Sequence, residues 1–210
     1  MDSAASRADY ADARFVRTQF ERLATRNGAL DRLDAGESEG IGVRVRVGGA
    51  WGFAASRGRE RAAAEGALAR ALELARAQPA APGAPLAPEP PARGSHESPC
   101  GRDPFEVALE DKLALLHAAD AKLRSATAGV SVAVARYEAL RTDKVFASTE
   151  GALCEQRLTE CGGGLAAVAV AGDQSQVRSW PASHGGHVTQ AGYEGFVSLD
   201  LAARAPVVAE

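Results

Sequence analysis

The densest group of potential metal ligands in the sequence is the segment His184-Gly185-Gly186-His187. Two histidines at this spacing can bind a metal ion, but a zinc site needs a further protein ligand, and none follows nearby. The flanking proline, serine and glycine residues indicate a loop. We therefore expect an exposed polar loop and no metal site, with His184 and His187 as the two residues to examine for metal binding.

Two other groups could carry chemistry. Gly162-Gly163-Gly164 could cradle a phosphate, but no Lys-Ser/Thr pair follows, and the next residues are typical of a strand. We expect a loop or bulge there. Cys100, Cys154 and Cys161 have neither metal-type spacing nor a nucleophile signature, so reduced thiols are expected, with a Cys154–Cys161 disulfide as the alternative.

Catalytic motifs are missing from the sequence. It contains no Gly-x-Ser-x-Gly, no His-Glu-x-x-His and no His-Glu-x-x-x-His. No residue is therefore predicted to be catalytic, and no cofactor-binding residue is predicted.

Composition narrows the class of protein. The 210 residues are 46% hydrophobic and 24% charged, which is typical of a globular protein. The net charge is −3, with both signs mixed along the chain, so no nucleic-acid ligand is expected. No run of 18 apolar residues and no signal-peptide pattern is present, which predicts a cytoplasmic protein without membrane contact.

Proline divides the chain into two halves. Residues 79–102 are rich in proline and alanine and predict a linker without helix or strand. We expect a hairpin-rich half at 1–78, whose helix spans 57–78, and a helix-plus-meander half at 103–210. The predicted fold class is α+β, with antiparallel hairpins and meanders packed against two main helices. Gly28-Ala29-Leu30 and Gly151-Ala152-Leu153 leave an internal α+β duplication open.

The second main helix is predicted to begin at Asp103-Pro104, with Asp103 as its N-cap. Leucines at helical spacing predict its buried face, and Lys112 is expected to lie off that face. The leucines are Leu109, Leu113, Leu116 and Leu123.

The most regular pattern is the segment 40–55. Ile41, Val43, Val45 and Val47 alternate with polar or small residues, and Gly48-Gly49 then predicts a two-residue turn. Trp51, Phe53 and Ala55 alternate in the second strand. We expect a β-hairpin with one strongly apolar face. Arg44 and Arg46 lie on the other face, where we expect them to be solvated or in structural salt bridges, with the binding of carboxylates as the alternative.

This hairpin resembles the amino-terminal signature of the TldD/PmbA proteins, which are zinc metallopeptidases also known as modulators of DNA gyrase. The Asp-Pro helix start with its Asp111-Lys112 pair and the turn Ser148-Thr149-Glu150-Gly151 are similar to that family too. The signature residues are Gly40, Gly42, Val43, Arg44, Trp51, Gly52 and Phe53.

The resemblance implies a parent protein that hydrolyses peptides with zinc. In the family, the zinc site uses a His-Glu-x-x-x-His helix and a distant cysteine, and no residue of this chain matches them. We therefore expect an amino-terminal, non-catalytic domain that is inactive alone and shapes the substrate cleft and subunit contacts. It would hold no cofactor itself.

The resemblance also implies partners: a second TldD/PmbA-type subunit, in a homo- or heterodimer, and a peptide or unfolded-protein substrate. One alternative is a non-catalytic scaffolding or binding subunit of such a pair. Another is an independent small-ligand domain that uses Gly162–Gly164.

Overall fold

The computed structural model describes residues 2–79, 84, 86–127 and 129–210. Residues 80–83 and 85 of the predicted linker lie outside the described residues. The described strands are β1 (Tyr10–Arg26), β2 (Ala29–Val47), β3 (Ala50–Arg57), β4 (Arg93–Glu97), β5 (Val130–Ser148), β6 (Leu153–Ala171), β7 (Gln174–Trp180) and β8 (His187–Thr189). The helices are α1 (Asp2–Ala5), α2 (Arg61–Ala77), α3 (Leu109–Ala126), α4 (Tyr193–Val197) and α5 (Leu201–Ala209).

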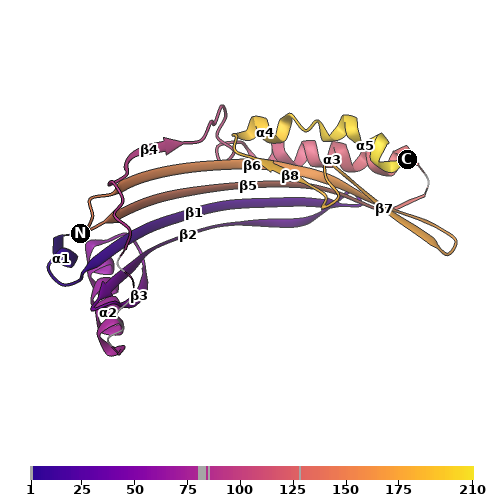
Figure 1. Ribbon diagram of the computed structural model, residues 1–210. Helices are drawn as coiled ribbons and strands as arrows, with labels where there is room; N and C mark the ends of the chain where they lie inside the picture. Colours follow the sequence, from indigo (N-terminus) through magenta and orange to yellow (C-terminus); the bar gives the residue numbers. More distant parts are fainter. Residues whose placement is uncertain (1, 80–83, 85, 128) are drawn as a thin grey trace. The chain divides into compact units, whose positions relative to one another are not determined.

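The strands form one sheet in the order β3-β2-β1-β5-β6-β4, and β7 and β8 also pair with β6 (Figure 1). The registers of β2 with β3 and of β6 with β7 are antiparallel, whereas β4 runs parallel to β6. The predicted α+β class is confirmed. No helix in the described part of the chain is long and apolar enough to cross a membrane.

The chain folds into two compact units, each assembled from separate segments. Unit 1 contains residues 1–18, 37–97 and 142–157, and unit 2 contains residues 19–36, 98–141 and 158–210. The long strands β1, β2, β5 and β6 contribute to both units. Each unit therefore combines residues from both sides of the proline-rich segment. The division of the sequence into two halves at that segment stays a prediction.

In unit 1, helix α2 packs on the hairpin formed by β2 and β3. The predicted apolar positions Ile41, Val43 and Val45 are buried against Leu68 and Leu72 of the helix. The turn Gly48-Gly49 has positive φ at both residues, 58° and 86°, as predicted for a two-residue hairpin.

The expected position of Trp51 and Phe53 on the apolar face is wrong. The two-residue turn pairs Val47 with Ala50, so Arg46 faces Trp51 and Arg44 faces Phe53. Residues directly opposite in an antiparallel pair share a face, which places both aromatic rings on the side away from the valines. Phe53 is 61% exposed as a result.

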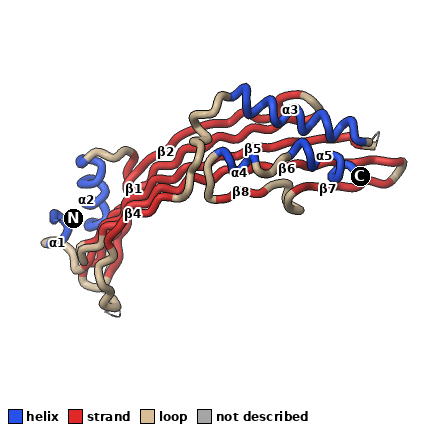
Figure 2. Tube along the Cα trace, turned by 90° about the horizontal axis from the view of Figure 1, so that it is seen from above, coloured by secondary structure: helices blue, strands red, loops and turns tan. Residues whose placement is uncertain are grey.

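In unit 2, α3, α4 and α5 cover one face of the strands (Figure 1), and α3 and α5 pack against each other (Figure 2). The core beneath them includes Leu23, Leu116, Tyr137, Leu165 and Phe196. A two-residue turn at Asn27-Gly28 joins β1 to β2, again with positive φ at both residues. Its Gly28 amide donates to the fully buried carboxylate of Asp120 in α3, at 3.0 Å.

Two predictions for the middle of the chain are wrong. Asp103 is not the helix N-cap, because α3 begins at Leu109 after Ala108. The Asp103 carboxylate instead accepts a hydrogen bond from the Phe105 amide at 2.9 Å. The predicted linker contains β4, which pairs with Leu153–Arg157. Residues 93–97 include no proline, so every amide there can donate to a strand.

Candidate functional site

The two candidate histidines lie at the side of β6 in unit 2. His187 begins β8, which pairs with Cys161–Gly163 of β6, and His184 precedes it in a turn closed by the Gly185 amide and the Ala182 carbonyl, 2.9 Å apart. Both side chains are exposed. The segment is thus a loop that leads into a short strand, and the predicted exposed loop is confirmed for His184.

The three consecutive glycines hold this loop against the sheet. Gly162, Gly163 and Gly164 lie inside strand β6, so the predicted loop or bulge is wrong. A Cβ at Gly162 would lie 1.9 Å from the His187 carbonyl oxygen, and one at Gly164 would lie 2.3 Å from that of Gly185. Only residues without a side chain allow this close approach of two backbones. Their role is therefore packing, and no local sequence signal separates this role from phosphate binding.

Both histidines line a cleft of about 620 Å³ that we call the histidine cleft. It is also lined by Arg22, Arg32, Asp31, Arg136, Tyr137, Glu138 and Val188. Arg22 Nε donates to Glu138 Oε1 at 2.8 Å, and Arg26 lies 3.4 Å from Asp31. Arg136 has no ion-pair partner within the described segments, so the cleft carries unneutralised positive charge.

The histidine cleft does not fit a zinc ion. Zinc in enzymes is held by three protein ligands of the His, Cys, Asp or Glu type, and no such group of three occurs among the described residues. The neighbouring guanidinium groups would also repel a cation. The arrangement can bind an anion or a polar peptide group.

The three cysteines differ in burial: Cys100 is exposed, Cys154 is half-buried and Cys161 is buried. No disulfide joins cysteines in the described part of the chain, so the alternative Cys154–Cys161 disulfide is not formed. Cys161 is fully buried, and this burial raises its pKa to about 11. The thiol is therefore protonated near neutral pH and is a poor nucleophile.

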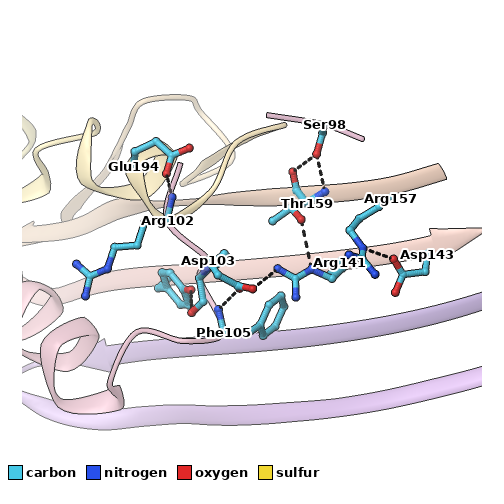
Figure 3. Close-up of polar contacts among 11 residues, drawn as sticks. Ser98, Arg102, Asp103, Phe105, Arg141, Asp143, Arg157, Thr159 and Glu194 are labelled. Carbon is cyan, nitrogen blue, oxygen red and sulfur yellow. Dashed lines mark hydrogen bonds and ion pairs between the residues drawn. The ribbon is translucent and has the colours of Figure 1, made fainter. Parts of the chain in front are cut away.

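A polar network fixes residues 98–105 on the strands of unit 2 (Figure 3). Arg141 pairs with Asp103 at 2.7 Å, lies over the ring of Phe105 and reaches Thr159 Oγ1 at 3.4 Å. Ser98 Oγ accepts from the Thr159 amide at 2.8 Å. Every group in this network already has a protein partner, which indicates a structural role.

Glu194 fastens the same segment to α4 (Figure 3). Its carboxylate accepts from the amides of Gly101 at 2.8 Å, Arg102 at 3.0 Å and Gly192 at 2.8 Å. These donors, led by the Gly101 amide, lower the pKa of Glu194 to about 2. The carboxylate is thus ionised at neutral pH and acts as an anchor, not as a general acid.

Lys112 was wrongly predicted to lie off the buried face of α3. Its side chain is 1% exposed, donates to Glu21 Oε1 at 2.5 Å and lies over the Tyr137 ring at 5.3 Å. Lys112, Leu116, Ala119 and Leu123 are spaced i, i+4, i+7 and i+11, so helical periodicity alone contained the signal. The prediction followed the leucines and left Lys112 off the buried face, because a lysine is rarely fully buried.

The signature hairpin of unit 1 holds its arginine rigidly. Arg44 Nε and Nη2 donate to Asp12 Oδ2 at 2.8 Å and 2.6 Å, and the guanidinium lies over Trp51 at 4.9 Å. Asp12 is 5% exposed, so this is a partly buried salt bridge. The predicted structural salt bridge is confirmed for Arg44. Arg46 Nη2 donates to the Ala84 carbonyl oxygen at 2.8 Å.

Two family models match the sequence. The model of PmbA/TldA metallopeptidase domain 1 matches residues 11–77, and that of the PmbA/TldA metallopeptidase central domain matches residues 102–209. A metalloprotease from Synechocystis sp. is 29% identical over 154 residues, which are 72% of this chain and 32% of that protein. The chain thus spans about a third of the length of this curated relative.

Solved structures share the fold. TldE from Thermococcus kodakarensis superposes with a TM-score of 0.75 at 12% identity, over 99% of this chain and 45% of that one. A putative modulator of DNA gyrase from Thermotoga maritima gives 0.69 at 17% identity, over 95% and 44%. One from Bacteroides thetaiotaomicron gives 0.70 at 13%, over 91% and 43%.

Proposed function

The chain belongs to the PmbA/TldA (TldD/PmbA) metallopeptidase family, and from this premise we propose that it is the non-catalytic amino-terminal part of a zinc peptidase. In this proposal the parent hydrolyses peptides in the cytoplasm, and the present residues shape the substrate cleft and the subunit contacts. Two findings taken together are the observation that carries the proposal. Two family domain models cover most of the chain, whereas the described residues include no group of three metal ligands.

The residues present support the proposal that the metal chemistry belongs to another part of the parent protein. A hydrolytic zinc needs an open coordination position and a base beside it, and neither His184 nor His187 has a carboxylate or thiolate neighbour that completes such a site. We propose that the zinc ligands lie outside these 210 residues. The roles left to this chain are to bind and orient the substrate and to contact another subunit.

An unpaired strand edge supports a binding role. β3 pairs with β2 only from Gly40 to Val47, so residues 29–39 of β2 have an outer edge without a partner strand in the described part of the chain. Such an edge can accept an extended peptide, or a strand of a second TldD/PmbA-type subunit, through backbone hydrogen bonds. An NMR titration with unfolded peptides that leaves the amides of 29–39 unshifted would count against peptide capture at this edge.

Metal content tests the proposal directly. Elemental analysis of the 210-residue chain and of the longer parent should find no zinc in the first and about one zinc per chain in the second. Only the longer protein should cleave an unfolded substrate, and a chelator should abolish cleavage. Stoichiometric zinc in the 210-residue chain would refute the assignment and would make His184 and His187 the first ligands to test by substitution.

The same observation also supports a second candidate, a scaffolding or binding subunit of a TldD/PmbA-type pair. Such a subunit would contain no zinc even at full length. The absence of zinc from both proteins, together with retained binding of a peptide or a partner subunit, would favour this candidate over the peptidase.

A further inference from the structure

The signature hairpin has a second face that the core of unit 1 does not explain. Alternate residues of three adjacent strands point to the face opposite α2 and line a cleft of about 430 Å³, which we call the signature cleft. The lining residues at these alternate positions are Asp12, Arg14 and Val16 of β1, Gly40, Gly42 and Arg44 of β2, and Phe53 and Ala55 of β3. Four of the seven signature residues therefore meet here.

The floor of the signature cleft contains two glycines, Gly40 and Gly42, which have no side chain. A Cβ at Gly42 would lie 3.1 Å from Cε2 of Phe53, and one at Gly40 would lie 2.9 Å from the Ser56 carbonyl oxygen. Gly42 lets the Phe53 ring lie close to the sheet while 61% of the residue stays exposed, and Gly40 allows close approach to the backbone of β3. An exposed aromatic ring adds little to folding but offers a large apolar contact to a ligand.

The rim of the signature cleft is positively charged. Asp12 neutralises Arg44 and, together with the Trp51 ring, fixes its position. Arg14 lies over the ring of Phe146 at 5.3 Å and has no carboxylate within 4.0 Å in the described part of the chain. One acidic and two basic side chains leave a net charge of +1. An arginine stacked on a ring keeps its hydrogen-bond donors available to a carboxylate.

We propose that the signature cleft binds an extended peptide segment in which an aromatic or large aliphatic residue contacts Phe53 and an acidic residue two positions along pairs with Arg14. In an extended chain, residues i and i+2 point to the same side, about 6.6–6.8 Å apart. Because the two side chains leave the segment on the same side, both can enter a single cleft that Phe53 and Arg14 line. The assignment of this segment as substrate rests on the proposed function, whereas the binding itself does not.

Fluorescence anisotropy of labelled peptides with the 210-residue chain tests the site. The probe is Ser-Gly-Phe-Thr-Glu-Gly-Ser, with a second peptide in which Lys replaces Glu. We expect the Glu peptide to bind about tenfold more tightly than the Lys peptide. Replacing Glu by Lys removes a solvent-exposed attraction to Arg14 and adds a repulsion of similar size. Phe53→Ala should weaken binding of both peptides about tenfold, and Arg14→Gln should remove the preference for Glu.

Arg178→Gln in unit 2 is the matched control, since Arg178 is also an exposed strand arginine, and it should leave both affinities unchanged. Equal affinities for the two peptides, or equal effects of Arg14→Gln and Arg178→Gln, would overturn the proposal. A dimer in gel filtration that Phe53→Ala dissociates would also overturn it, by making this face an interface between copies. The assay needs no metal, so failed zinc binding by the parent would not affect its result.

Discussion

Gly52 offers the sharpest test of how the signature hairpin and α2 fit together. A Cβ at this position would lie 2.0 Å from the carbonyl oxygen of Ala71 and 2.7 Å from the amide nitrogen of Ala75. Both atoms belong to the helix backbone, which no rotamer change can move aside. Because ordinary contact begins near 3.4 Å, Gly52→Ala requires the helix to withdraw by 3.4 − 2.0 = 1.4 Å or the strand to bend by as much.

The cost follows from what the withdrawal exposes. Helix α2 buries Leu68 and Leu72, whose burial is worth about 1.5–3 kcal/mol each, together with three alanines. A gap of up to 1 Å already loses a quarter to a half of a contact's attraction. We therefore expect Gly52→Ala to lower the free energy of unfolding of unit 1 by about 3 kcal/mol.

Urea unfolding followed by circular dichroism measures this loss, and α2 provides the control. Gly66 lies on the exposed side of the helix, where a Cβ would meet nothing within 4 Å. Gly66→Ala should therefore raise the free energy of unfolding by about 0.5–1 kcal/mol through helix propensity. A Gly52→Ala protein within about 0.5 kcal/mol of the unmodified chain would refute the close approach of strand and helix.

Three further predictions concern unit 2. Lys112→Met should lower the free energy of unfolding by about 2 kcal/mol, because Glu21 is left without its partner, and adding Glu21→Gln should recover part of the loss in urea unfolding. Glu194 has a lowered pKa of about 2, so its stabilisation is complete above the unfolded-state pKa near 4.3 and is lost towards pH 2. Glu194→Gln should therefore lose less stability than the unmodified chain in urea titrations between pH 5 and 2. Cys161 should react with a thiol reagent only after unfolding, so that two of the three thiols react in the native protein.

Strong local patterns made much of the fold predictable. The alternating valines of 41–47 and the Gly48-Gly49 turn after Val47 set strand positions that the structure confirms. The helix expected at 57–78 is present as Arg61–Ala77. These features depend on neighbouring residues only, which is why a single sequence reveals them.

The errors arise where tertiary contacts override local signals. Asp103 has the sequence of a helix cap, but Arg141, distant in sequence, holds its carboxylate and the helix begins six residues later. Lys112 is buried because Glu21 on another element neutralises it. The glycines at 162–164 form a strand because residues 185–188 approach their backbone. No local sequence pattern predicts this contact with residues 185–188.

The signature hairpin shows how far stability alone explains a sequence motif. Val43 and Gly52 face α2, and the packing of the helix accounts for the identity of both. Gly42, Arg44 and Phe53 point to the other face, where the fold gains little from an aromatic ring that is 61% exposed. Successive residues of each strand therefore alternate between the face that packs against α2 and the face that is open to a ligand. A hairpin selected for stability alone would not need the exposed Phe53 ring, which is the reason for proposing that this ring contacts a ligand.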